Sequence, residues 1–264
     1  MKLGTLYLVP NTLGEDNRNA QIQHVIPPLV VQVASQLDCW IVENAKTARS
    51  FLNAIHQVCP LRKPLQEIIM QQWRGPDADL KPIDLIQPLL QGQDMGLMSE
   101  AGLPGIADPG TEIVAIAHAM KIQVRPLTGP NSLMLALMSS GMSGQHFSFH
   151  GYLPIKPPER MKKLKAMEIE SKVNQSAHLW IETPYRNSSM LSGIVASLQP
   201  TTQLCMAMDL TLPTELIVRQ TIEDWKFLLQ DPKGPLPKDL DKRPAVFILQ
   251  SSLLERDAFQ RTGK

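Results

Sequence analysis

Residues 99–110 combine small side chains with the end of an apolar run in a pattern that suits ligand binding. The residues are Ser99-Glu100-Ala101-Gly102-Leu103-Pro104-Gly105-Ile106-Ala107-Asp108-Pro109-Gly110. They follow a short apolar run, so the pattern predicts a strand, a loop and the start of a helix. Small residues leave backbone amide and carbonyl groups uncovered, and a flat, nucleoside-like cofactor could lie against them. An ordinary loop is the alternative, with Asp108 as the helix N-cap and Pro109 in the first turn.

Spacing argues against several other kinds of site. Residues 99–110 lack the three glycines of a G-x-G-x-x-G dinucleotide loop, and no Gly-Lys-Ser or Gly-Lys-Thr occurs that would indicate a Walker-type phosphate loop. The six histidines are scattered without a metal-binding pair, and no GxSxG sequence occurs. We therefore expect neither a metal site nor acyl-transfer chemistry.

A second group of polar residues follows the apolar run at residues 178–181. Glu182 comes directly after that run and before a predicted helix start, so it could lie at a strand end and orient Arg186. A structural salt bridge is the alternative interpretation of this carboxylate. Together with Glu100 and Tyr185, these residues are the candidates for catalysis.

Strands and helices alternate along the chain, which predicts an α/β fold with mainly parallel strands in the first half. We expect strands at residues 5–9, 39–42, 96–99, 122–125, 147–149, 177–181, 203–208, 215–219 and 245–250. We expect helices at residues 47–58, 111–120, 131–140, 159–170, 187–198 and 222–229. Two successive strands within residues 203–219 indicate a hairpin and a mixed second sheet.

The segment at residues 126–130 contains Pro and Gly and interrupts this alternation. We place a domain boundary there, with an N-terminal α/β domain at residues 1–126 and a C-terminal α/β domain with a mixed sheet at residues 127–264. Asn131 and Ser132 then begin a helix. Both residues suit an N-cap, and a helix N-terminus also favours an anion such as a cofactor carboxylate, so both interpretations stay open.

Composition limits the classes of partner. The formal net charge is +1, so any contact with nucleic acid must come from a local patch. Residues 156–165 are the best such patch, although a solvated helix face is the alternative. The three cysteines are widely separated and form no disulfide or metal framework, and no apolar run is long enough to cross a bilayer. A cytoplasmic protein that does not contact the membrane is the expectation.

The chain resembles the tetrapyrrole-methylase superfamily, and within it the branch of ribosomal small-subunit RNA methyltransferase I. The similar segments, in order, are Ser99-Glu100-Ala101-Gly102-Leu103-Pro104, Ala107-Asp108-Pro109-Gly110, Leu127-Thr128-Gly129-Pro130-Asn131-Ser132, Ser140-Gly141, Phe147–Pro154 and Ile181–Arg186. Several ordered motifs in one chain are far more specific than any one of them.

The resemblance implies a two-lobed class III methyltransferase fold with its active site in the cleft between the lobes, and S-adenosylmethionine as cofactor. It implies cofactor contacts from residues 99–104, Asn131, Ser132 and Leu210. It further implies a homodimer, and ribosomal RNA or the small ribosomal subunit as partner. The expected reaction is methylation of the ribose 2′-oxygen of a cytidine in small-subunit rRNA, with Glu182, Arg186 and Glu100 as the catalytic candidates.

Three segments depart from the family pattern. They are residues 9–14 at the end of the first strand, residues 42–46 after the second strand, and residues 208–212. These departures affect the expected acceptor more than the cofactor loop. Two alternatives therefore stay open: a methyltransferase of this fold that acts on a small molecule or a protein, and a cofactor-binding protein without catalysis.

Overall fold

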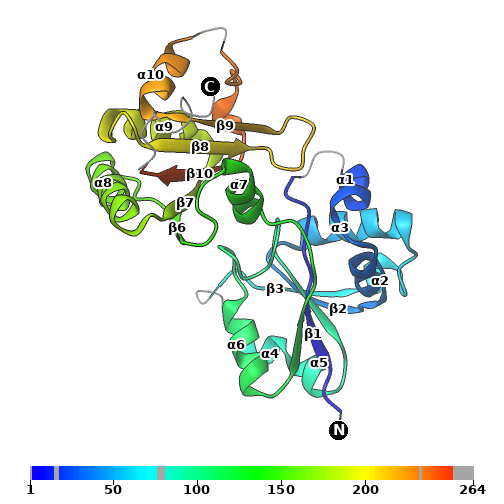
Figure 1. The fold of residues 1–264 in the computed structure, drawn as a ribbon. Coiled ribbons are helices and arrows are strands. Elements are labelled where there is room, and N and C mark those ends of the chain that lie inside the picture. Colours follow the sequence, from blue (N-terminus) through cyan, green and yellow to red (C-terminus); the bar gives the residue numbers. More distant parts are fainter. Residues whose placement is uncertain (1, 15–17, 76–80, 232–233, 252–264) are drawn as a thin grey trace, which may run out of the picture. The chain divides into compact units, whose positions relative to one another are not determined.

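The computed structural model describes residues 2–14, 18–75, 81–231 and 234–251. The chain divides into two compact units, residues 1–131 (unit 1) and 132–264 (unit 2), and each contains one five-stranded sheet (Figure 1). The boundary predicted from the sequence lies after residue 126, whereas this division follows Asn131.

Unit 1 is built on a parallel sheet with the strand order β3-β2-β4-β1-β5. Its strands are β1 (Thr5–Leu8), β2 (Cys39–Val42), β3 (Ile69–Gln72), β4 (Met95–Met98) and β5 (Gln123–Pro126). β2 and β4 are buried along their whole length, as expected of inner strands of a parallel sheet covered on both faces. Gly96 lies opposite Trp40 in the register of β4 and β2, and a Cβ there would approach the indole ring to 2.5 Å.

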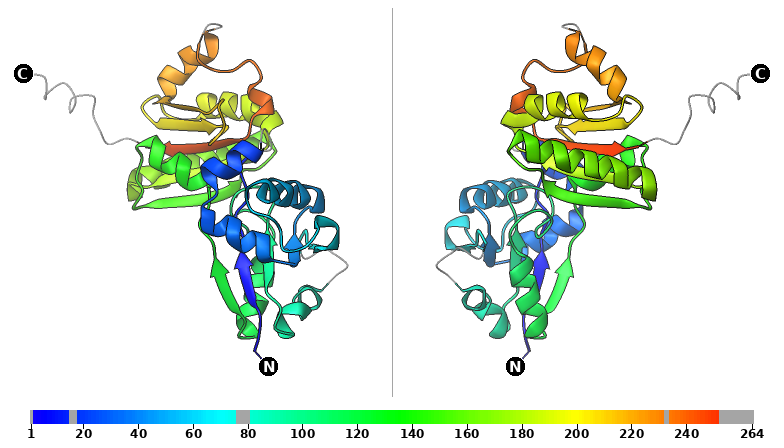
Figure 2. Two further views of the ribbon diagram at one scale, coloured as in Figure 1. Left: turned by 90° about the vertical axis from the view of Figure 1, so that its right-hand side faces the viewer. Right: turned by 90° about the vertical axis from the view of Figure 1, so that its left-hand side faces the viewer.

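Helices cover both faces of this sheet. They are α1 (Arg18–Val25), α2 (Pro28–Gln36), α3 (Ala45–Val58), α4 (Pro82–Leu85), α5 (Gln87–Leu90), α6 (Thr111–Ala119) and the 3-10 turn η1 (Leu65–Glu67). Alternate residues of β2 serve different cores: Trp40 packs with α1, α2 and α3, whereas Ile41 packs with α4, α5 and α6. Figures 1 and 2 show α3 and α6 on opposite faces of the sheet.

Unit 2 contains a mixed sheet with the strand order β6-β7-β10-β8-β9. Its strands are β6 (Phe147–Tyr152), β7 (Ala177–Glu182), β8 (Gln203–Met208), β9 (Leu216–Thr221) and β10 (Ala245–Gln250). β6 and β7 are parallel and the other neighbours are antiparallel. The β8–β9 hairpin and the mixed sheet agree with the sequence-based expectation.

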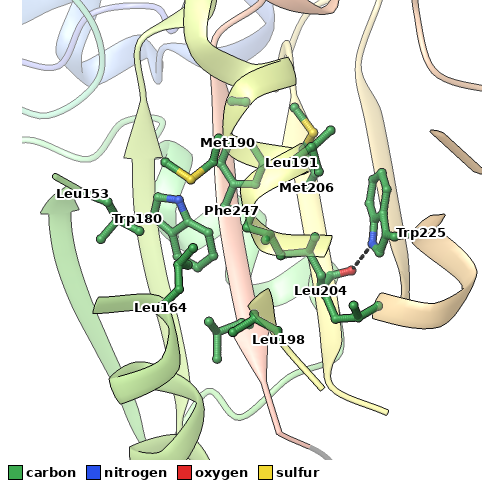
Figure 3. Packing of buried hydrophobic residues seen from close by; sticks show 14 of the residues in the cluster. Leu153, Leu164, Trp180, Met190, Leu191, Leu198, Leu204, Met206, Trp225 and Phe247 are labelled. Carbon is green, nitrogen blue, oxygen red and sulfur yellow. Dashed lines mark hydrogen bonds between the residues drawn. The ribbon is translucent and has the colours of Figure 1, made fainter. Parts of the chain in front are cut away.

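The helices of unit 2 pack around a large apolar core. They are α7 (Ser132–Ser140), α8 (Pro157–Asn174), α9 (Asn187–Ser197), α10 (Ile222–Gln230) and the 3-10 turns η2 (Pro184–Arg186) and η3 (Leu240–Lys242). The core lies between the sheet and α8, α9 and α10. Trp180 stacks on Phe247 with ring centroids 5.5 Å apart, and the indole N–H of Trp225 donates to the Leu204 carbonyl at 3.0 Å (Figure 3).

The sequence missed some elements, and the alternative interpretation of residues 108–110 placed a helix N-cap wrongly. α1, α2, β3, α4 and α5 were not anticipated, because β3 is a half-exposed edge strand ending in two glutamines and prolines divide the segment of α4 and α5. The N-cap of α6 is Gly110, with φ 131°, and no side chain caps the helix. The alternative with Asp108 as N-cap is therefore wrong, since Asp108 lies in the preceding loop.

Candidate functional site

The carboxyl ends of the five parallel strands of unit 1 lie at one edge of the sheet. After β2 the chain moves outward to β3, whereas after β4 it moves to β5 on the other side of the sheet. β2 and β4 are neighbours, so the connections diverge between them. Ligands of open α/β sheets bind at the carboxyl edge beside such a divergence. This edge is therefore the part of unit 1 where a cofactor is expected from topology alone.

The 99–104 loop lies at this edge and is fixed against the end of β1. The side-chain amide of Asn11 donates to the carbonyls of Ser99 and Glu100, at 3.2 and 2.7 Å. The Asn11 backbone N–H donates to the Gly102 carbonyl at 2.8 Å, and the Gly102 N–H donates to the Thr12 carbonyl at 3.4 Å. Both backbone groups of Gly102 are thus used within the protein, contrary to the expectation of an uncovered loop backbone, while Ala101 is exposed.

Gly102 has a conformation that requires glycine. Its φ is +64°, and a Cβ would lie 3.2 Å from a methyl of Leu13 and 3.5 Å from the Pro130 carbonyl oxygen. Gly129 is equally constrained, since a Cβ there would lie 2.1 Å from the Pro10 side chain. The loops after β1, β4 and β5 therefore pack together at Gly102 and Gly129 more closely than larger residues would allow.

Three carboxylates gather beside the loop. Glu43, which follows β2, accepts from the Glu100 backbone N–H at 3.0 Å, and the Asn44 amide donates to the Glu100 carboxylate at 2.6 Å. Burial raises the pKa of Asp108 to about 7, with Glu43 and Glu100 adding to the rise and the Ser99 hydroxyl opposing it. A carboxyl that titrates near neutral pH can take up a proton under physiological conditions.

Asp108, Glu43 and Asn44 are residues of this edge that sequence reasoning missed. The sequence pattern offers Asp108 as a helix cap, and residues 42–46 depart from the family pattern. The sequence did contain one signal for them. Acidic residues follow both β2 and β4, the two strands between which the connections diverge. Of the predicted cofactor residues, Ser99–Pro104 lie at this edge, Asn131 directly precedes α7, and Ser132 begins α7.

In unit 2, one edge of the sheet brings three segments together. Glu182 at the end of β7, Ala245 at the start of β10 and Met208 at the end of β8 are in register across the sheet. The residues next to them along the chain therefore share this edge. These residues include the candidates Arg186 and Leu210, which are far apart in the sequence.

Glu182 and Arg186 form a buried ion pair. One carboxylate oxygen of Glu182 accepts from the Thr183 N–H at 2.7 Å, from Nε of Arg186 at 2.8 Å, and from Nη2 of Arg186. The Glu182 side chain is fully buried and that of Arg186 is 16% exposed. The other Glu182 oxygen is buried and has no partner among the described residues. This geometry suits a carboxylate that positions Arg186 better than one that takes up a proton.

Leu210 lies in a strained turn after β8. Asp209 and Thr211, on either side of it, have φ values of 49° and 71°, a region that non-glycine and especially β-branched residues rarely adopt. Leu210 itself is buried in this turn. Such strain persists only where the surrounding contacts enforce it.

Arg243 enforces this turn and connects it to the Glu182 region. Its guanidinium donates to the Asp209 carboxylate at 2.7 Å and to Asp239 at 3.0 Å. The Asn187 amide, which follows Arg186, donates to the Arg243 carbonyl at 2.8 Å. The Glu182–Arg186 pair and the contacts of Arg243 thus adjoin each other through Asn187, an arrangement that sequence reasoning missed because its members lie on three separate segments.

Comparison with solved structures defines the class of fold. The structure is similar to uroporphyrin-III C-methyltransferase of Thermus thermophilus, with a TM-score of 0.53, 13% identity, and 94% of each chain covered. It is also similar to the cobalamin biosynthetic enzyme cobalt precorrin-4 methyltransferase, with a TM-score of 0.57, 12% identity, and 93% and 94% of the two chains covered. The fold is that of the tetrapyrrole-methylase class III methyltransferases, as the sequence motifs indicated.

Comparison with curated sequences defines the family. Ribosomal RNA small subunit methyltransferase I of Synechocystis sp. is 34% identical over 221 residues, which cover 84% of this chain and 72% of the relative. The protein of that name from Halalkalibacterium halodurans is 32% identical over 223 residues, covering 84% and 69%. No family model matches the chain. The chain belongs to the ribosomal RNA small subunit methyltransferase I family, which confirms the identification from the sequence motifs.

Metal ligands and membrane-spanning helices are both absent from the described part of the chain. Within the described ranges, no group of three or more histidine, cysteine, aspartate or glutamate side chains could hold a metal ion. No helix among the described residues is long and apolar enough to cross a membrane.

Proposed function

We propose that this protein transfers a methyl group from S-adenosylmethionine to ribosomal RNA of the small subunit. The observation that carries the proposal is 34% identity over 221 residues to a ribosomal RNA small subunit methyltransferase I. The position of the 99–104 loop at the carboxyl edge of the unit 1 sheet supports it, because ligands of open α/β sheets bind at such an edge. S-adenosylmethionine supplies an activated methyl group and its own leaving group when bound.

We assign the residues of the two edges as follows. The 99–104 loop binds the nucleoside part of the cofactor, with Glu100 held in place by Asn44 and Glu43. Asn131 and Ser132 lie at the start of α7, where helix N–H groups favour a carboxylate. For Leu210 we propose a cofactor contact, as the family resemblance implies. Arg186, positioned by Glu182, orients the acceptor.

The acceptor that we propose is the ribose 2′-hydroxyl of a cytidine. Methylation of a hydroxyl forms an O–C bond, breaks the S–C bond of the donor and releases the hydroxyl proton. Asp108 lies beside the cofactor loop and its pKa of about 7 suits uptake of that proton. We further propose that the protein acts as a homodimer in the cytoplasm, as the family resemblance implies.

Methyl transfer to small subunits tests the proposal. Purified protein is incubated with radiolabelled S-adenosylmethionine and with small ribosomal subunits that lack the modification. We expect label in the rRNA, and none with a variant whose cofactor loop is blocked. Label in a protein or metabolite fraction without label in RNA would support the alternative acceptor, and cofactor binding without any transfer would support a non-catalytic protein.

A further inference from the structure

We propose that the first half of α8, together with the exposed ring of Tyr185, is the surface on which unit 2 holds single-stranded RNA. The inference rests on the proposed function and adds to it the place of substrate contact. We refer to residues 156–165 as the basic segment.

The basic segment concentrates the positive charge of the protein. It contains Lys156, Arg160, Lys162, Lys163 and Lys165 against the single acid Glu159. The whole chain has a formal net charge of only +1, so the remainder of the chain is net acidic. A polyanion would therefore be attracted to this segment rather than to the protein as a whole.

The charges of the basic segment are poorly neutralised within the protein. Lys156 lies 3.7 Å from Glu159, but both side chains are largely exposed, at 79% and 61%, and such pairs are weak. None of the other ion pairs found among the described residues involves this segment. Lys162 and Lys165 are exposed. A phosphate backbone could therefore engage these ammonium groups without first breaking strong internal pairs.

Arg160 adds a buried, hydrogen-bonded guanidinium to the exposed lysines of the basic segment. It is 5% exposed, and its Nη2 donates to the Ser189 hydroxyl at 3.1 Å. A neutral hydroxyl leaves the positive charge of the guanidinium uncompensated. The hydrogen bond also ties the first turn of α8 to the first turn of α9, which follows Arg186. The start of the basic segment is thus fixed close to the proposed catalytic edge.

The sheet places the start of the basic segment at that same edge. β6 and β7 are parallel, so their carboxyl ends lie together, and Tyr152 of β6 is in register with Ile181, the residue before Glu182. α8 begins only a few residues after Tyr152. An RNA whose reacting hydroxyl lies at Arg186 would therefore lie close to the first turns of α8.

Exposed aromatic rings distinguish this surface from an ordinary solvated helix face. Tyr185 in η2 is 72% exposed, although it lies between Pro184 and the buried Arg186 ion pair. Tyr152 at the end of β6 is 56% exposed. Unpaired bases stack on such rings, whereas a duplex presents only its backbone and grooves. Lysines and exposed tyrosines at one edge therefore favour a single-stranded RNA segment.

Charge reversal on the basic segment tests the proposal. The double variant Lys162→Glu/Lys165→Glu is compared with wild type for binding of a single-stranded RNA oligonucleotide at several salt concentrations. We expect at least roughly tenfold weaker binding, and a slope of log affinity against log salt that is shallower by about 0.7 for each phosphate that the variant no longer neutralises. The matched control Lys226→Glu/Lys238→Glu changes the same charge at two exposed sites of unit 2 outside the segment and is expected to bind like wild type.

The aromatic part is tested separately. Tyr185→Ala is expected to weaken RNA binding several-fold with an unchanged salt slope, and Tyr185→Phe is expected to retain it, because stacking needs the ring and not the hydroxyl. Cofactor titration and thermal unfolding of each variant check that the fold and the cofactor site are intact.

The outcomes distinguish an error in the proposed RNA-binding surface from an error in the proposed function. Wild-type affinity and salt slope in Lys162→Glu/Lys165→Glu, or an equal loss in the control variant, would overturn the assignment of the surface. If wild type binds RNA through the basic segment yet transfers no methyl group to small subunits, the surface stands and the proposed function fails. If wild type binds no RNA, the surface assignment is wrong as well.

Discussion

The two sheet edges of this molecule build their sites by different means. In unit 1, parallel strands end together, and hydrogen bonds of Asn11 and Gly102 hold the 99–104 loop. In unit 2, the sheet is mixed, and side-chain clamps such as Arg243 to Asp209 hold the strained turn. We therefore expect backbone geometry to determine ligand binding in unit 1 and side-chain pairing to determine it in unit 2.

Gly102→Val should have the largest effect, because it attacks the backbone of the unit 1 edge. A branched side chain at φ +64°, in contact with Leu13 and Pro130, forces the loop to move. We expect S-adenosylmethionine affinity to fall by roughly 100-fold, or about 2.7 kcal/mol, by calorimetric titration. Gly144→Val is the matched control, since a Cβ there meets nothing within 4 Å and its φ lies outside the strained region. Unchanged affinity in Gly102→Val would contradict the assignment of the loop.

Arg243→Gln should have the next largest effect, because it releases the clamp of unit 2. The Asp209–Thr211 turn would be deprived of the ion pair that holds its strain, so we expect cofactor affinity to fall by roughly tenfold. Unfolding of unit 2 should cost about 1–2 kcal/mol less by chemical denaturation. Arg243→Lys should restore part of both losses, and Lys242→Gln, at an exposed neighbour, should change neither. A loss of stability with full cofactor affinity would limit Arg243 to a structural role.

Asp108→Asn should change how the stability of the protein and the rate of methyl transfer depend on pH. The pKa of Asp108 is raised to about 7, so its carboxyl is protonated below that pH and cannot accept a proton. The wild-type rate should rise with pH through about 7, and Asp108→Asn should be slower and lack this rise. A pH–rate profile with saturating cofactor measures both.

The raised pKa of Asp108 also affects stability, and in the opposite direction: the rate should rise with pH, whereas stability should fall. Because ionisation of Asp108 is disfavoured in the folded protein, its contribution to stability is lost as pH rises from its ordinary pKa of 3.8 to about 7. Asp108→Asn should therefore unfold at a higher temperature than wild type above neutral pH. The raised pKa would be contradicted if wild type and Asp108→Asn had equal melting temperatures both below pH 3.8 and above about pH 7.

Replacing one member of a histidine pair in unit 2 should give the smallest effect, a change in how stability depends on pH. Nε2 of His150 lies 2.8 Å from Nδ1 of His178, and burial lowers the pKa of His150 to about 4 and also lowers that of His178. The folded protein thus binds fewer protons than the unfolded chain below the ordinary pKa of 6.5, so stability should fall as pH drops from there toward 4. His150→Leu should weaken this dependence in thermal melts, whereas His146→Gln, at an exposed position, should leave it unchanged.

The sequence predicted best those elements that are determined by the spacing of apolar residues and by turn residues. Buried strands such as β2, β8 and β10 were anticipated with their observed bounds, because apolar runs between turn residues leave little choice. β3 escaped prediction because an edge strand with polar residues lacks that pattern. The family motifs correctly indicated the fold class and the family, since several ordered motifs constrain a chain more than any single one does.

The candidate site was only partly predictable, for a physical reason. Residues 99–104 are contiguous, so their shared loop is visible in the sequence. Asp108 depends on carboxylates brought close by β2 and β4, and Arg243 depends on the register of β7, β10 and β8. Contacts between distant segments leave no local pattern, and the pKa of Asp108 arises only in the folded protein.

The most direct test of the central claim is nucleoside analysis of the rRNA. Small subunits that lack the modification are incubated with the protein and S-adenosylmethionine, and the rRNA is digested and analysed by mass spectrometry. We predict that 2′-O-methylcytidine appears with wild type and is absent with Gly102→Val. No new methylated nucleoside with wild-type protein that binds the cofactor would contradict the assignment of ribosomal RNA as the methyl acceptor.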